Sequence, residues 1–98
     1  MTMTIGAARL SIYFESGNSL KEKRHVVRSL MKRVQNQYNA AAAEIEDLDD
    51  LRVATIGIAC VSNNAAHADE MLAEVIRFIE RNVMIGTLAE VETELIPY

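Results

Sequence analysis

The sequence predicts an α+β domain in which one antiparallel sheet of four strands carries two helices on the same face. Two long segments repeat apolar side chains at helical spacing, and four shorter segments alternate apolar and polar side chains. Their order along the chain is strand, helix, strand, strand, helix, strand, which is the β-α-β-β-α-β order of the ferredoxin-like fold. We assign residues 1–98 to one such domain.

The first strand and the first helix have the clearest boundaries. Residues 4–14 alternate apolar and more polar side chains, which predicts a strand, and residues 16–18 are typical of a turn. Ser19 and Glu22 have the spacing of a capping box, in which each side chain accepts a hydrogen bond from the other residue's backbone amide. The helix that begins there is expected to end near Tyr38.

The second strand is the least distinct element. Residues 39–46 contain a run of alanines that also favours helix, but the fold requires a strand at this place. We assign it as a weak edge strand with Ala41, Ala43 and Ile45 on the inner face. An acidic loop, residues 47–50, follows it.

The second half of the chain repeats the pattern of the first half. A strand is expected over residues 51–61, and N-cap candidates at 62–64 precede a helix that runs to about Asn82. Gly86 then interrupts the chain before a last strand over residues 88–96. The apolar face of the second helix is expected to comprise Ala68, Leu72, Val75, Ile76 and Ile79. The strand before it is expected to turn Ile56, Ile58 and Cys60 inward.

The charge is unevenly distributed along the chain. Half of the residues are hydrophobic, a quarter are charged, and the net charge is −4. Residues 1–33 alone carry +5 and residues 34–98 carry −9. The sequence has neither a signal-peptide pattern nor an apolar run long enough to span a membrane, and its one cysteine, Cys60, has no partner within the chain. We therefore expect a cytoplasmic protein.

The first helix concentrates the positive charge. At 100° per residue, Lys21, Arg24, Arg28 and Lys32 fall in one stripe opposite the apolar face, whereas Lys23 falls near the edge of the apolar face. Cations in a first turn oppose the helix dipole, so stability alone does not explain them. We identify Lys21, Lys23, Arg24, Arg28 and Lys32 as candidate contacts to the phosphates of structured RNA. Pairing with the chain's own acids remains the alternative.

The uncovered face of the sheet is a second candidate surface. Only Tyr13 is aromatic there, so recognition of single-stranded RNA by base stacking is not expected. Its small residues suit close packing against a second copy. The candidate partners of Arg9 are Glu90, Glu92 and Glu94, either within one chain or across a two-fold axis. We predict a homodimer through this face. The face comprises Arg9, Ser11, Tyr13, Thr55, Gly57 and Glu92.

No arrangement of residues predicts catalysis. His25 and His67 are expected at the surface, and Cys60 is expected to be a buried, unreactive thiol. The turn at 15–18 lacks the arginine that phosphate-cradling loops of acylphosphatases carry, and the acidic loop lacks the glycine and glutamate of a calcium loop. We therefore predict no enzyme activity, metal, cofactor or small-molecule substrate.

The hexapeptide at 19–24, Ser-Leu-Lys-Glu-Lys-Arg, resembles the signature of the YlxP-like family of small bacterial proteins. The similarity continues through Ala43-Glu44, Asp49 and Val61-Ser62. The chain departs from the family pattern at positions 51 and 53, which hold Leu51 and Val53 where an aromatic and a basic residue are expected.

The resemblance implies a ferredoxin-like fold, in agreement with the pattern of elements. Genes of the family often lie beside those for ribosome-binding factor A and an initiation factor, which implies a role near ribosome maturation or translation. Its biochemical activity is not established. We therefore expect a binding module that associates with ribosomal RNA or a ribosome precursor through the first helix. The competing interpretation is a homodimeric protein-interaction domain without nucleic-acid contact.

Overall fold

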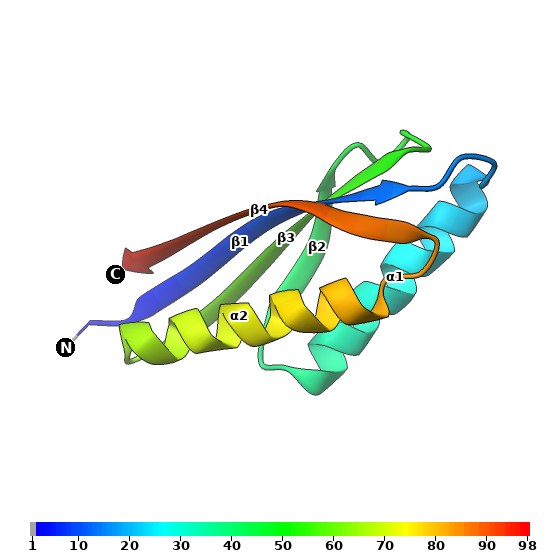
Figure 1. Ribbon diagram of the computed structural model, residues 1–98. Helices are drawn as coiled ribbons and strands as arrows, with labels where there is room; N and C mark the ends of the chain where they lie inside the picture. Colours follow the sequence, from blue (N-terminus) through cyan, green and yellow to red (C-terminus); the bar gives the residue numbers. More distant parts are fainter. Residues whose placement is uncertain (1) are drawn as a thin grey trace.

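The structure, a computed structural model, describes residues 2–98 and contains four strands and two helices in the predicted order (Figure 1). Their bounds are β1 Thr4–Phe14, α1 Leu20–Gln37, β2 Ala41–Glu46, β3 Val53–Ser62, α2 Ala65–Asn82 and β4 Gly86–Pro97.

The four strands form one sheet in the order β2-β3-β1-β4, and all three neighbouring pairs are antiparallel. Both helices lie on the same face of the sheet, and the other face is not covered by a helix (Figure 1). This is the predicted ferredoxin-like α+β arrangement. The domain is elongated, with dimensions of 50 × 21 × 16 Å.

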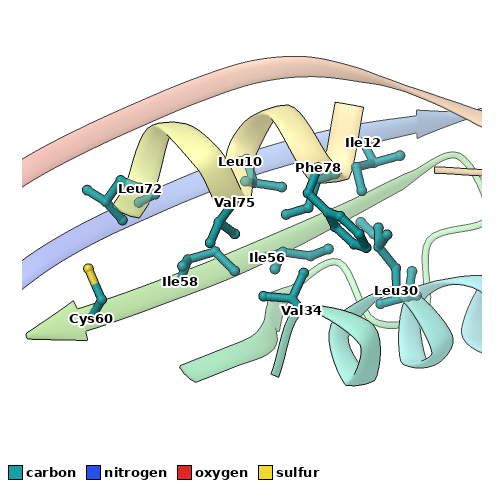
Figure 2. Packing of buried hydrophobic residues seen from close by; sticks show 14 of the residues in the cluster. Leu10, Ile12, Leu30, Val34, Ile56, Ile58, Cys60, Leu72, Val75 and Phe78 are labelled. Atoms are coloured by element: carbon teal, nitrogen blue, oxygen red, sulfur yellow. The ribbon is translucent and has the colours of Figure 1, made fainter. Parts of the chain in front are cut away.

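The core lies between the sheet and the helices. Leu10 and Ile12 of β1, with Ile56, Ile58 and Cys60 of β3, point toward α1 and α2, as their alternation predicts (Figure 2). The helices contribute the buried residues Val27, Leu30, Val34, Leu72, Val75, Phe78 and Ile79. About 25 cal/mol for each Å² of apolar surface removed from water makes this layer the main source of stability.

Phe78 is a core residue that the expected apolar face of α2 did not include. It is buried, whereas Ile76 is half-buried at the margin. The ring of Tyr38 meets Phe78 edge-on at 5.6 Å, and the guanidinium of Arg33 lies 5.2 Å from its centre. These contacts pin the end of α1 against α2.

Both helices begin with the predicted caps. Glu22 N donates to Ser19 Oγ and Ser19 N donates to Glu22 Oε1, each at 3.1 Å, which confirms the capping box. The side chain of Asn64 accepts from His67 N at 3.1 Å and caps α2. Caps of this kind contribute about 1 kcal/mol each.

The predicted orientation of β2 is wrong. Ala42 and Glu44 lie on the helix-covered face, because they pair with the inward residues Ile58 and Ile56. Ala41 and Ala43 therefore face the open side of the sheet. An irregularity in the pairing between Glu44 and Glu46 places Ile45 there too, with 42% of its surface exposed.

The last strand begins earlier than expected, at Gly86 rather than Leu88. Gly86 pairs with Phe14 at the end of β1. A Cβ atom at position 86 would lie 2.9 Å from Phe14 Cδ1 and 3.0 Å from the carbonyl oxygen of Tyr13. The glycine thus permits close approach of two strands rather than ending one.

We predict that Gly86→Ala lowers the free energy of unfolding by about 1–3 kcal/mol, because the added methyl group meets backbone as well as side chains. Thr87→Ala, at the exposed neighbouring position, is the matched control and should change it by less than about 0.5 kcal/mol. Urea denaturation of both variants measures the difference. Equal stabilities would show that the strand relaxes at this point.

Candidate functional site

The outer face of α1 carries a stripe of exposed cations. Lys21, Arg28 and Lys32 are exposed and have no ion pair among residues 2–98. Lys21, Arg24 and Arg28 line a shallow depression together with His25, which is exposed as expected. We call Lys21, Arg24, Arg28 and Lys32 the basic stripe. No carboxylate of residues 2–98 lines this depression, so the stripe presents a positive surface to solvent.

Arg24 is the one member of the basic stripe with an acidic partner in the described chain. Its Nη2 donates to Asp49 Oδ1 at 3.1 Å. The Asp49 side chain is 90% exposed and that of Arg24 is 43% exposed, so water and salt weaken the pair. An incoming phosphate can therefore compete with Asp49 for Arg24.

Lys23 does not belong to this surface, which corrects its assignment as a phosphate contact. Its side chain is fully buried. The Nζ atom donates to the carbonyl oxygens of Asp47 and Asp50, each at 2.6 Å, and lies 3.5 Å from Glu44 Oε2. The physical reason is its helical phase: Lys23 precedes the buried Val27 by four residues and shares its face.

The acidic loop between β2 and β3 is held by these contacts. Asp47 adopts a left-handed backbone conformation with φ 64°, and its Oδ2 accepts a hydrogen bond from Thr55 Oγ1 at 2.7 Å. Asp50 Oδ1 accepts from the amide of Arg52 at 2.8 Å. The ammonium group of Lys23 holds the same loop through its hydrogen bonds to the carbonyl oxygens of Asp47 and Asp50. The side chains of Asp47 and Asp50 therefore stabilise the conformation of the loop.

Not all of the residues predicted to form the dimer face are exposed on the open face of the sheet. Thr55 is buried, and the side chain of Ile45 lies over Gly57, 3.2 Å from where a Cβ atom would be. Thr55 is therefore not available to a partner, and Ile45 partly covers Gly57, which is half-buried. Arg9, Tyr13 and Glu92 are exposed, and Ser11 is half-buried between its strand neighbours.

Two exposed polar residues of this face, Arg9 and Tyr13, pair within the chain. Arg9 Nη1 lies 3.5 Å from Glu46 Oε1 of β2, not from a glutamate of β4 as expected. The Tyr13 hydroxyl donates to Glu90 Oε1 at 2.8 Å. This hydrogen bond raises the pKa of Tyr13, because only the neutral phenol can donate to the carboxylate.

Sequence reasoning missed two contacts near these surfaces. The expected orientation of β2, with Ala43 and Ile45 inward, implied an outward Glu44, whereas Glu44 lies inward beside Lys23. Ser62 Oγ lies 3.0 Å from His67 Nδ1 and also accepts from the amide of Asn64. Because Asn64 caps α2, this pair belongs to the start of the helix.

Cys60 is a buried thiol, as expected. Its burial raises the pKa of the thiol. Within residues 2–98, no group of three or more histidine, cysteine, aspartate or glutamate side chains is arranged to hold a metal ion. Neither helix of that same range is long and apolar enough to cross a membrane.

The fold defines the chain as a ferredoxin-like α+β protein. A family model described as "Protein of unknown function (DUF503)" matches residues 5–92. The chain belongs to this family, which confirms the resemblance carried by residues 19–24. It is 36% identical over 76 residues to "Uncharacterized protein YlxP" from Bacillus subtilis (strain 168), a match that covers 78% of this chain and 83% of that protein.

A solved structure supports the fold alone. The crystal structure of a C-terminal segment of the alpha subunit of aIF2 from Pyrococcus abyssi superimposes with a TM-score of 0.51 at 18% identity. The match covers 99% of this chain and 51% of that chain, so the domain spans about half the length of the solved structure.

We predict that Lys23→Met destabilises the fold by about 3 kcal/mol, because the change leaves Glu44 buried without its cation and two loop carbonyls without a donor. Lys21→Met in the same helical turn is the matched control, and it should change the stability by no more than about 0.5 kcal/mol. Chemical denaturation of the two variants compares them. A Lys23→Met protein as stable as the control would contradict the role of Lys23.

Proposed function

We propose that the protein is a binding module that contacts the phosphates of structured RNA through the basic stripe of α1. The observation that carries this proposal is that Lys21, Arg28 and Lys32 are exposed without ion pairs in the described chain. The alternative, pairing with the chain's own acids, accounts for Arg24 and Lys23 only. The remaining three cations have no acidic partner among residues 2–98.

The geometry favours folded RNA over single strands. Lys21 to Lys32 spans about 16 Å along the helix axis at 1.5 Å per residue, which allows contact with several successive phosphates. The strands of the open sheet face, by contrast, carry Glu90, Glu92 and Glu94, and within residues 4–97 Tyr13 is the one aromatic residue that they expose on this face. A face of that composition does not suit base stacking. The RNA therefore approaches the helix side.

Ribosomal RNA or a ribosome precursor is the partner we propose first. The support for this choice is the gene neighbourhood that the family resemblance implies, because phosphate contacts do not themselves distinguish one folded RNA from another. The proposed role is association rather than catalysis. The basic stripe contains charges for positioning a polyanion but no nucleophile activated by a neighbouring base.

We predict that the double variant Arg28→Glu, Lys32→Glu binds purified ribosomal RNA roughly tenfold or more weakly than the wild type. The logarithm of the association constant should also fall less steeply with the logarithm of the salt concentration, by about 1.5 in the slope, because two phosphate contacts are lost. Filter binding or fluorescence anisotropy over a series of salt concentrations measures both quantities.

The matched control is Arg77→Glu, Arg81→Glu on α2. This pair has the same i, i+4 spacing, the same exposure class and the same change in net charge. It should bind RNA nearly as well as the wild type. Equal losses in both variants would mean that only net charge matters, and tight binding that does not respond to salt would contradict phosphate contact altogether.

The second candidate function is a homodimeric interaction domain that uses the open sheet face. A hollow between β2 and β3 favours it. Small side chains line this hollow at Ala41, Ala43 and Ala59, and Ile45 stands exposed at its side. Small residues let a second surface approach closely, and an exposed isoleucine supplies apolar area to bury.

For the dimer, we predict that Ile45→Lys shifts the wild-type dimer to a monomer in sedimentation analysis, because the charge would be buried without a partner. Leu48→Lys is the matched control. Leu48 is 50% exposed against 42% for Ile45, but it lies in the loop outside the hollow. A wild-type protein that sediments as a monomer at micromolar concentration would refute the dimer.

A further inference from the structure

Strand β4 leaves one long edge of the sheet open. It is the outermost strand beside β1 and has twelve residues, twice as many as the opposite edge strand β2 (Figure 1). Among residues 2–98, no other strand pairs with its outer side. A free strand edge carries unpaired backbone donors and acceptors, and proteins use such edges to bind extended segments.

The register of the sheet identifies which backbone groups point outward. Met3 and Tyr98 exchange both backbone hydrogen bonds, Met3 N to Tyr98 O at 3.1 Å and Tyr98 N to Met3 O at 2.7 Å. In an antiparallel pair such hydrogen-bonded positions alternate with positions whose N–H and C=O point away from the partner. Counting along the unbroken register, Val91, Thr93 and Leu95 direct their backbone groups to the open edge.

The two faces of this edge differ in chemistry. On the open face of the sheet, β4 presents Glu90, Glu92 and Glu94 in strict alternation. On the helix side, Val91 and Leu95 are 41% and 36% exposed, because the helices do not cover them. An incoming strand would therefore meet carboxylates on one face and apolar side chains on the other.

This pattern opposes pairing of β4 with a second copy of itself. In an antiparallel pair centred on Glu92, Glu92 would lie opposite Glu92 and Glu90 opposite Glu94. A shift of the centre by one residue still places two of the three glutamates opposite each other. Like charges directly opposite across strands are destabilising. A segment of opposite charge therefore fits this edge better than a second copy of β4 in these registers.

We infer that the edge of β4 accepts an extended segment of a partner protein as a fifth strand of the sheet, in which lysine or arginine alternates with apolar residues. Cations of the segment lie opposite Glu92 and Glu94, which have no ion pair in the described chain, and Glu90 shares its carboxylate with Tyr13. Apolar residues of the segment cover Val91 and Leu95. This binding site lies on a different element from the basic stripe and does not depend on the RNA proposal.

The test uses a synthetic peptide of alternating lysine and valine, with a peptide of alternating glutamate and valine as its control. Calorimetry should show binding of the lysine peptide only. Hydrogen exchange should show new protection at the amides of Val91, Thr93 and Leu95. Binding of the lysine peptide without protection at these amides, or no binding at all, would overturn the inference.

Thr93→Pro provides the sharpest variant, because it removes one outward donor without removing a hydrogen bond to β1. It should weaken peptide binding about tenfold, the effect of one lost hydrogen bond. Thr93→Val retains the donor and is the matched control. If Thr93→Pro binds as well as Thr93→Val, the edge is not used.

Methylation of the peptide backbone tests the same inference in the wild-type protein, independently of whether Thr93→Pro folds. Methyl groups on one alternate set of peptide amides should abolish binding, whereas methyl groups on the other set should not. Equal effects of the two sets would overturn strand addition. Sedimentation of the protein alone as an assembly that Thr93→Pro disrupts would assign the edge to a second copy instead and would also overturn the inference.

Discussion

The buried ammonium group of Lys23 is the contact on which the arrangement of α1, β2 and the loop between β2 and β3 depends. Removal of a charged group from water costs several kcal/mol unless hydrogen bonds and an opposite charge offset it. Two carbonyl oxygens at 2.6 Å and the Glu44 carboxylate at 3.5 Å supply that compensation. One side chain therefore joins the first turn of α1 to the inward Glu44 and to the loop between β2 and β3.

The cations of α1 fall into two groups with different roles. Lys23 serves the fold, and the loop that it holds brings Asp49 beside Arg24. Lys21, Arg28 and Lys32 stay outside this network, so a ligand can engage them without disturbing the core. Because this surface lies on a helix, its backbone is already ordered before a ligand binds.

The elements that the sequence predicted well are those with a strong local signal. The capping box at Ser19 and the alternation in β1 and β3 each specify type and direction independently of the rest of the chain. The direction of β2 could not be predicted in this way. Its three alanines favour neither face, and Ile45, the one residue with a preference, lies where the pairing is irregular and projects to the open side.

The candidate site was predictable only in part, for a related reason. Helical phase correctly grouped Lys21, Arg28 and Lys32, but a lysine at the edge of an apolar face has two outcomes, and only the tertiary partners of Lys23 decide between them. The hexapeptide at 19–24, with the similarity that continues to Val61-Ser62, correctly indicated the family. The partner of the site does not follow from the fold, since ferredoxin-like domains serve many unrelated functions.

The separation of charge between the two faces makes the net charge of −4 a poor guide to behaviour in solution. The basic stripe points away from the sheet, whereas Glu90, Glu92 and Glu94 lie on the uncovered side, and the domain is 16 Å across its smallest dimension. That thickness is about two Debye lengths at physiological ionic strength. A polyanion near α1 is therefore largely shielded from the repulsion of the far face. At low ionic strength this shielding fails, and the molecule acts as an electric dipole that turns its helix side toward a polyanion before contact.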